Sequence, residues 1–320
     1  MVSDALTVEG RTSGMTATQI QPLREGDLAL AGQLMSRAVN LVRERAGLPP
    51  LADPGGGGRR PLPLMNYIFS QGPELSWGAY DGQTLAGFLV GCVHDRQWHV
   101  AYLFVDPEYQ GLGIGRDLLS QGFGDPRVQE MHFFSQCAPT HDLRAIGLAS
   151  HFGMFPRKAL LLMRGTDLRN RALRPRSETV VMQPIASVET VSELNRMDCE
   201  VRGVNRAADH CFWLSQDDYA GFVFAVNKRT VGYAYISRKG AIGPVLAARD
   251  LFMTDLLVHC LHEVREQKCE DVHLWVCGKN FIAIQLLLES GLQFEEIAVL
   301  MTNRVFCDLR RYLPHSLVLF

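Results

Sequence analysis

The stretch FVDPEYQGLGIGRDLL (residues 104–119) decides the fold, because it joins a strand-like run to a helical run through three glycines. The strand pattern stops at Pro107, and the helix pattern begins after the alternating Gly111, Gly113 and Gly115. Glycine permits positive φ angles and lets another molecule approach the main chain closely. Free N–H groups at a helix start bind phosphates, and Arg116 adds a positive charge. The stretch predicts a phosphate-binding turn; the alternative is a glycine turn that only joins strand to helix.

Other glycine-rich nucleotide motifs fit this stretch less well. A nucleotide-triphosphate loop requires Lys followed by Ser or Thr after the glycines, and neither follows here. A dinucleotide-binding fold places an acidic residue at the end of a second strand roughly 20 residues further on, which is also missing. The turn therefore favours a different phosphate-bearing ligand.

Strand and helix patterns alternate on both sides of this turn, over residues 17–165. Strand patterns cover 17–23, 75–93, 99–105, 130–137 and 158–165, and helix patterns cover 24–47, 114–121 and 143–154. Asp81 and Gly82 indicate a hairpin inside the second strand region. The segment 48–64, with four glycines and five prolines, is expected to be disordered or to cover a site as a lid.

The second part of the chain repeats this order of elements without repeating the residues. Helix patterns at 190–201, 249–268 and 281–291 alternate with strand patterns at 220–226, 230–237, 241–247, 271–277 and 295–304. We therefore predict a flexible tail (1–16), a first domain (17–165), a linker (166–180) and a second domain (181–320). The expected fold class is α/β, in the mixed-sheet α+β sense, with two similar lobes in tandem, each a mixed sheet flanked by helices.

Composition excludes several classes of protein. The 320 residues carry a formal net charge of -2, which gives no reason to expect a nucleic-acid-binding surface. No apolar run approaches the roughly 20 residues of a membrane-spanning helix, so no membrane partner is expected. The N-terminus lacks the layout of a secretory signal, and the eight cysteines are scattered without a CxxC pair. We expect a cytoplasmic protein with reduced thiols.

The segment VDPEYQGLGIG resembles the acyl-CoA signature of the GNAT superfamily of N-acyltransferases, written Q/R-x-x-G-x-G/A, and the resemblance covers residues 17–165. It implies that acetyl-CoA or another acyl-CoA is bound, with pantetheine between the strands at 99–105 and 130–137. It also implies that a main-chain N–H near Val105 contacts the acyl carbonyl. The implied cofactor-binding residues are Phe104, Val105, Gln110, Gly111, Leu112, Gly113, Ile114, Gly115 and Arg116.

The sequence departs from the family where the departing thiolate is usually protonated. The helix 143–154 resembles the family's A-x-x-L-Y-x-x-x-G-F helix, but the tyrosine position is Ala149. His99 is the leading candidate for the base, since it shares a strand face with the residues before the turn and has a suitable unperturbed pKa. The alternative is an ordinary polar residue at a strand start. His141 and Asp142 are further site candidates, and Asp142 is also a suitable helix cap.

The second lobe lacks the cofactor signature. Arg249 and Asp250 stand where the glycines would be, and Leu287 falls at the tyrosine position, so this lobe resembles a family fold that no longer binds cofactor. The segment 197–214 gathers Asp198, Arg202, Arg206, Asp209 and His210. This cluster predicts either recognition of a charged acceptor between the lobes or surface ion pairs at a helix end.

The expected function is transfer of an acetyl or short acyl group from acyl-CoA to a primary amine of a small molecule or amino-acid-like acceptor. The expected state is a monomer or homodimer, and no metal is predicted. Two alternatives stay open. One is a non-catalytic acyl-CoA-binding regulator or scaffold, which the missing tyrosine and the degenerate second lobe favour. The other is acetylation of a protein N-terminus or lysine.

Overall fold

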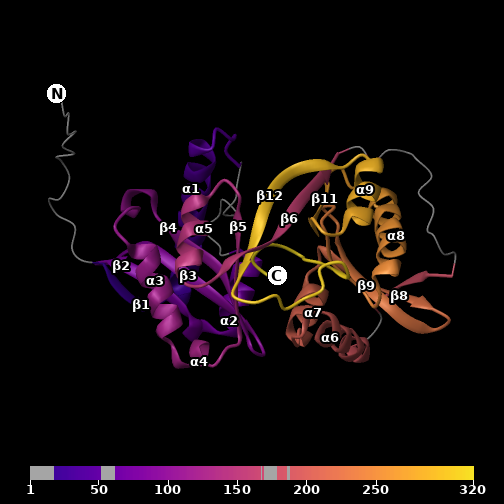
Figure 1. Cartoon of the computed structure of the whole chain (residues 1–320), viewed down its shortest axis with the longest axis horizontal. Coiled ribbons are helices and arrows are strands. Elements are labelled where there is room, and N and C mark those ends of the chain that lie inside the picture. Colours follow the sequence, from indigo (N-terminus) through magenta and orange to yellow (C-terminus); the bar gives the residue numbers. More distant parts are fainter. Residues whose placement is uncertain (1–17, 52–61, 167, 169–178, 186–187) are drawn as a thin grey trace.

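A computed structural model describes residues 18–51, 62–166, 168, 179–185 and 188–320. The first half of the chain lies on the left of Figure 1 and the second half on the right, with strands crossing between them. The predicted tail (1–16), most of the predicted linker (166–180) and the centre of the Gly/Pro segment (52–61) lie outside the described residues.

The first half contains the predicted strand–helix alternation. Its strands are β1 (Gln19–Pro22), β2 (Ser76–Asp81), β3 (Thr84–His94), β4 (Gln97–Val105), β5 (Phe133–Pro139) and β6 (Phe155–Gly165). Its α-helices are α1 (Leu28–Arg45), α2 (Pro63–Gln71), α3 (Ile114–Gly124), α4 (Pro126–Gln129) and α5 (Leu143–His151). Gly82, at φ 60°, makes the predicted turn between β2 and β3.

The second half follows the same order. Its strands are β7 (Val181–Pro184), β8 (Tyr219–Val226), β9 (Arg229–Ser237), β10 (Ile242–Ala247), β11 (Val272–Cys277), β12 (Gln293–Thr302) and β13 (Tyr312–Leu313). Its α-helices are α6 (Val188–Arg202), α7 (Ala207–Ser215), α8 (Met253–Glu266) and α9 (Phe281–Glu289). Asp142 and Asn280 cap the matching helices α5 and α9, each by accepting a backbone N–H three residues on, which supports the internal repeat.

The two halves exchange strands. One sheet has the order β1-β2-β3-β4-β5-β12-β6-β11, and the other has the order β13-β10-β9-β8-β7. β12 of the second half lies between β5 and β6 of the first, while β6 in turn lies between β12 and β11 of the second. Figure 1 shows β6 and β12 side by side where the halves meet. Each half therefore completes its sheet with a strand from the other.

Apolar residues at helical spacing hold α1 against the first sheet. Leu28, Ala31, Leu34, Met35 and Ala38 are buried along one face, and α1 contacts β3 and β4. This spacing is the one from which the helix 24–47 is predicted, although the α-helix begins at Leu28 after a short 3-10 turn. The position of α1 over β4 brings the C-terminal turn of the helix to the glycine turn, as described below.

Helices α2 and α7 are absent from the sequence-based predictions. Each has nine residues, and α2 begins directly after the Gly/Pro segment, so neither extends the apolar period far enough to be recognised. They meet across the two halves, where the rings of Tyr67 and Phe212 stack at 4.1 Å. Both helices therefore contribute to the contact between the halves.

The prediction of surface ion pairs in the segment 197–214 is wrong. Asp198, Arg202, Arg206, Asp209 and His210 are all buried, so they cannot form a solvated helix end. Asp198 accepts hydrogen bonds from the Tyr233 hydroxyl and pairs with His210. Burial of four of these groups is possible because they pair with one another, Asp198 with His210 and Arg206 with Asp209. Arg202 instead donates to the Phe320 carbonyl and lies over the Tyr312 ring.

Asp209 joins the two halves electrostatically. It pairs with Arg206 Nε at 2.6 Å and with His94 Nε2 at 2.8 Å, and it accepts the Tyr67 hydroxyl at 2.7 Å. Burial alone would lower the pKa of His94, but Asp209 and Cys92 outweigh burial and raise it to about 10. His94 and Tyr67 belong to the first half, and Asp209 to the second. The cluster is therefore an internal contact between the halves.

No α-helix within the described residues is long and apolar enough to cross a membrane. The eight cysteines are unpaired, with Cys92, Cys260 and Cys277 buried in apolar surroundings. Within the described ranges no group of three or more His, Cys, Asp or Glu side chains is arranged to hold a metal ion.

Candidate active site

A slot opens between β4 and β5. The two parallel strands pair from Gln97 opposite Phe133 to Val100 opposite Gln136. β4 then continues to Val105 and β5 to Pro139, and in the described chain the two strands do not pair with each other beyond that point. The register against β3 shifts at Ala101, a β-bulge that bends β4. The splay expected between these strands is therefore present.

The main chain at the end of β4 faces this slot. Asp106 N–H donates to the Ala86 carbonyl of β3 at 2.9 Å. Antiparallel strands alternate between pairs that exchange hydrogen bonds and pairs that do not, so the neighbouring Val105, opposite Gly87, directs its N–H and carbonyl away from β3. In agreement, the Val105 carbonyl accepts the Gln110 side-chain amide at 3.2 Å. The Val105 N–H is thus available to a carbonyl oxygen in the slot.

The glycine turn presents free N–H groups at the start of α3. Gly111 and Gly113 have φ angles of 88° and 87°, and a Cβ built on either would meet nothing within 4 Å. The first N–H groups after the turn with a backbone acceptor are those of Arg116 and Asp117, which both bond Gly113. Among the described residues, the N–H groups of 111–115 have no hydrogen-bond acceptor. This arrangement fits a phosphate group.

Gly115 has a different role from the other two glycines. It lies inside the first turn of α3, and a Cβ there would come within 3.3 Å of Leu148 on α5. Its small size therefore lets α3 and α5 pack closely. This contact positions α5 beside the glycine turn.

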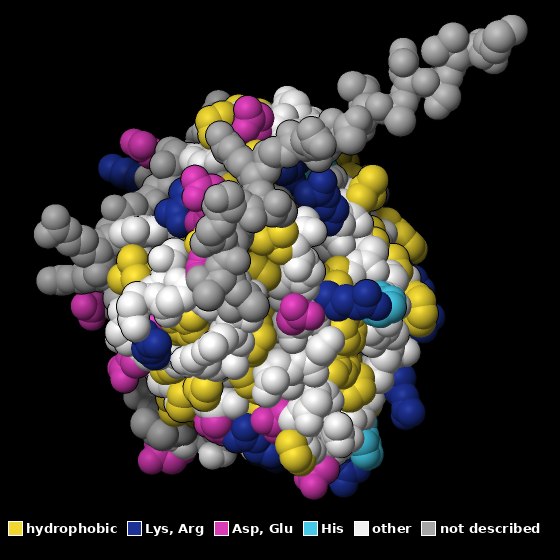
Figure 2. Space-filling model, turned by 90° about the vertical axis from the view of Figure 1, so that its left-hand side faces the viewer, with side chains coloured by type: hydrophobic (Ala, Val, Ile, Leu, Met, Phe, Trp, Pro, Cys, Tyr) yellow, Lys and Arg dark blue, Asp and Glu magenta, His cyan; other side chains and the backbone are white. Residues whose placement is uncertain are grey.

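The slot and the turn form one pocket with a volume of about 430 Å³. Its wall comes from α1, the end of β4, the glycine turn, the start of α3, the end of β5, the start of α5 and one residue of β12. The charged and titratable side chains in the wall are Arg43, Arg45, Arg116, Arg144, Tyr109, His141, Asp142 and Glu296. The face of the first half in Figure 2 shows acidic and basic side chains interspersed with hydrophobic ones in its described part. The pocket wall itself carries four arginines against two carboxylates, Asp142 and Glu296.

Eight of the nine residues predicted to bind cofactor lie in the pocket wall. They are Phe104, Val105, Gln110, Gly111, Gly113, Ile114, Gly115 and Arg116. Leu112 lies outside the wall, with 56% of its surface exposed. Gln110 is held by α1, because Arg45 donates to its side-chain oxygen at 2.9 Å. Arg37 of α1 also pairs with Asp106, so two arginines fix the turn against that helix.

The structure does not support His99 as the base. His99 is buried outside the pocket wall, and both ring nitrogens have partners. Nε2 donates to the Leu317 carbonyl at 2.9 Å, and Nδ1 accepts from the Ser135 hydroxyl at 2.9 Å. Burial lowers the pKa of His99 to about 4. The imidazole is therefore a neutral core group with no free lone pair facing the slot.

Asp142 has the helix-capping role that the sequence offered as one of its two possible roles. Asp142 caps α5 by accepting the Ala145 N–H at 2.9 Å, as the capping alternative predicts, and it also borders the pocket with His141. Ala149, at the position of the family's tyrosine, is buried against Met154 and Met301 and does not reach the pocket. Among the described wall residues, Tyr109 is the one tyrosine, and its hydroxyl donates to Asp81.

Sequence reasoning missed the contributions of α1 and β12 to the pocket. Arg43 and Arg45 end α1, where basic residues in a last turn are commonly assigned to the helix dipole. Glu296 comes from the second half, and only the insertion of β12 beside β5 brings it here. The one local signal is the pair Glu295–Glu296 at the start of a strand, which by itself does not indicate a site.

The matching slot in the second half is filled by the chain itself. β10 and β11 are connected by a single parallel bridge between Ala241 and His273. Further along β10, β13 pairs with it, with Val245 opposite Leu313 and Leu246 opposite Tyr312. β13 thus lies along the strand edge that the slot leaves open in the first half.

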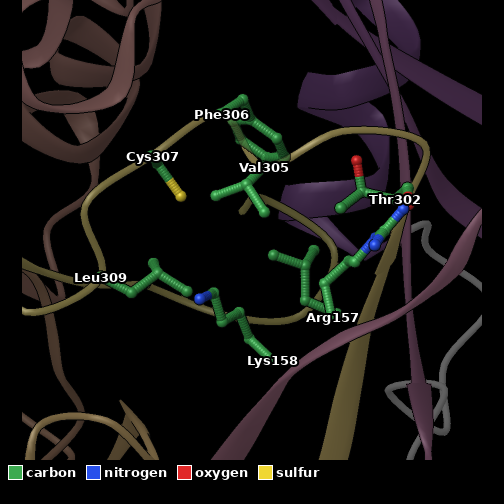
Figure 3. A pocket seen from close by; sticks show the side chains of 8 residues that line it. Arg157, Lys158, Thr302, Val305, Phe306, Cys307 and Leu309 are labelled. Carbon is green, nitrogen blue, oxygen red and sulfur yellow. The ribbon is translucent and has the colours of Figure 1, made fainter.

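A much smaller hollow lies between β6, β12 and the segment that follows β12 (Figure 3). Arg157 and Lys158 line one side, and Val305, Phe306 and Cys307 line the other. Its volume of about 10 Å³ holds about one water molecule. A substrate does not fit there. The pocket at β4 and β5 is the candidate active site because the free N–H groups of the glycine turn open onto it.

Comparison with protein-family models gives two matches. The Acetyltransferase (GNAT) family model matches residues 32–154, and a second Acetyltransferase (GNAT) domain model matches residues 194–308. The chain is a tandem GNAT protein. The first match includes the slot and the glycine turn, and the second covers the half whose slot is filled by β13.

Solved structures similar to this tandem GNAT protein extend over nearly its whole length. A candidate acetyltransferase from Pyrococcus horikoshii has 14% identity and a TM-score of 0.68, with 96% of this chain and 97% of that chain covered. A GCN5-related N-acetyltransferase from Sphaerobacter thermophilus has 16% identity, a TM-score of 0.60, and coverage of 92% and 98%. A tandem GNAT protein from the clavulanic acid biosynthesis pathway has 15% identity, a TM-score of 0.59, and coverage of 89% and 98%. These similarities show the fold. No curated protein matches the sequence.

Proposed function

We propose that the protein transfers an acetyl or short acyl group from acyl-CoA to a primary amine of a small molecule or amino-acid-like acceptor. Residues 105–116 would hold the cofactor, with the diphosphate on the glycine turn and pantetheine along the slot. The observation that carries the proposal is the row of free N–H groups at 111–115, which opens onto a 430 Å³ pocket with four arginines in its wall.

The residues of the slot have defined tasks in such a transfer. The Val105 N–H would donate to the thioester oxygen and stabilise the negative charge that develops there as the amine attacks. The slot and the turn would together fix the thioester, so that attack becomes effectively intramolecular. The new C–N bond forms as the C–S bond breaks, and the sulfur keeps the electron pair of that bond. With Ala149 in place of a tyrosine, the sulfur would leave as a thiolate that takes a proton from water.

Calorimetry on Gly113→Asp tests the cofactor assignment. The added carboxylate places negative charge and a side chain at a position with φ 87°, where the phosphates are expected. CoA and acetyl-CoA should bind the native protein and lose at least a hundredfold in affinity for the variant. Lys228→Asp, at a residue with φ 64° in the turn between β8 and β9, is the matched control and should bind as the native protein does. Equal CoA affinity in all three proteins would refute the assignment.

Two observations favour a second candidate function, a non-catalytic acyl-CoA-binding regulator. The tyrosine position is a buried alanine, and the second slot is filled. Thiol release from acetyl-CoA, measured with a panel of amino acids, polyamines, amino sugars and aralkylamines, separates the two candidates. Binding of CoA without thiol release on any amine would favour the regulator.

A further inference from the structure

Glu296 is the one carboxylate that the second half contributes to the described wall of the first half's pocket. The register explains its position, because Ala298 lies opposite Pro139 at the end of β5, and Glu296 lies two residues before it on β12. The Ile297 carbonyl accepts both the N–H and the hydroxyl of Thr140, which ties β12 to the turn before α5. The carboxylate is therefore held at the mouth of the slot by backbone contacts on both sides.

The surroundings of Glu296 leave its carboxylate available. No hydrogen bond or ion pair joins it to another residue in the described part of the chain. The titratable groups that face it are Arg43 of α1, His141 of the turn after β5, and its neighbour Glu295; Asp142 and Arg144 lie in the same pocket wall. Burial raises the pKa of Glu296, and His141 and Arg43 reduce this effect without cancelling it.

A half-buried carboxylate without a partner in an acyl-transfer pocket has two uses. It can bind an ammonium group, and it can accept a proton from that group once the amine is in place. His99 is not available for the second task, because both of its nitrogens are occupied. Asp142 is committed to the cap of α5. Among the described wall residues, Glu296 and His141 are the remaining candidates, and Glu296 has the negative charge that attracts an ammonium ion.

We infer that Glu296, contributed by the second half of the chain, binds the acceptor ammonium and accepts its proton in the pocket of the first half. The inference rests on the proposed function. The ammonium would lose one proton to the Glu296 carboxylate, and the freed nitrogen lone pair would attack the thioester carbon. The second nitrogen proton passes to water as the amide forms, the departing thiolate takes a proton from water, and Glu296 returns its proton to water before the next cycle, so charge and atoms balance.

The test is acetyl transfer from acetyl-CoA by Glu296→Gln, with the amine panel described above. The amide keeps the size of the side chain but cannot take a proton. We expect CoA affinity within twofold of the native value and a loss of at least a hundredfold in kcat/KM for the amine at pH 7, as is typical when a general base is removed. Glu295→Gln is the matched control, since Glu295 is exposed and pairs with Arg164 outside the pocket. It should behave as the native protein.

The pH dependence of acetyl transfer distinguishes loss of a proton acceptor from a change in the structure of the pocket, which would leave the shape of the profile unchanged. For the native protein, transfer should rise with pH as Glu296 loses its proton and then reach a plateau. For Glu296→Gln, it should rise about tenfold per pH unit up to the pKa of the amine itself, because only the free amine reacts. A Glu296→Gln variant with kcat/KM within threefold of native and an unchanged profile would overturn the role of Glu296 alone. Native protein that transfers acetyl to no amine would overturn the proposed function and this role together.

Discussion

Replacement of Asp209 by alanine should destabilise the protein severely. The substitution removes the acceptor of Tyr67 and leaves the buried His94 and Arg206 without their counter-charge. Breaking a buried ion pair by removal of one partner costs about 3–5 kcal/mol of unfolding free energy. The pKa of His94 gives a second figure, which also contains the effects of burial and of Cys92. A rise from 6.5 to about 10 corresponds to about 5 kcal/mol, at about 1.4 kcal/mol for each tenfold change in proton affinity.

Urea denaturation followed by circular dichroism measures this effect. We expect Asp209→Ala to lose about 3–5 kcal/mol at pH 7. Asp218→Ala should lose less than about 1 kcal/mol, because Asp218 forms an exposed pair with Lys239. A loss for Asp209→Ala as small as that of the control would refute the reasoning.

The pH dependence of the same measurement has a defined sign. The folded-state pKa of His94 lies above its unfolded value, so its contribution is complete below about pH 6.5 and is lost as the pH rises through about 10. Burial would raise the pKa of Asp209, but His94 and Arg206 hold it below its usual range, so its contribution is lost only as the pH falls through the acid range. The difference between native protein and Asp209→Ala should therefore shrink above pH 10. An equal difference at pH 7 and pH 10.5 would show that His94 is not the charged partner.

Three further predictions follow from the same contacts. His99→Ala should lose about 1–3 kcal/mol of stability in urea, because the Leu317 carbonyl loses its donor. The pH–rate profile of transfer should keep its shape, and a displaced profile would restore His99 to the mechanism. Calorimetry should find one CoA per chain, since β13 fills the second slot, and two sites would contradict that assignment. Gly115→Val should weaken CoA binding at least tenfold by pushing α5 outward at Leu148, and unchanged affinity would show that the packing of α3 on α5 does not position the turn.

The geometry of the glycine turn could be predicted from sequence because it is local. Gly111 and Gly113 adopt positive φ angles within a single continuous segment, and the strand before it and the helix after it have clear periodicity. The same locality explains why the cap at Asp142 could be anticipated. Most of the order of strands and helices in both halves could also be predicted, since it depends on short-range patterns, but the short elements α2, α7, β7 and β13 could not.

The features that were missed depend on contacts between distant residues. His99 has the spacing of a slot residue, yet Leu317, more than 200 positions later, covers its second nitrogen. Glu296 has no local signature, because the exchange of β12 into the first half is not visible in the periodicity of either segment. The charged cluster at 197–214 resembled a solvated surface because its partners, Tyr67 and His94, lie in the other half.

The exchange of β6 and β12 makes the molecule a covalent pseudo-dimer. Its two parts cannot be produced as separate, complete domains. Without β12, residues 18–166 would expose the unpaired edges of β5 and β6, which are open templates for aggregation. The second half therefore acts as a scaffold subunit that closes its neighbour's sheet. Any engineering of the protein by module swapping must replace both halves as one piece.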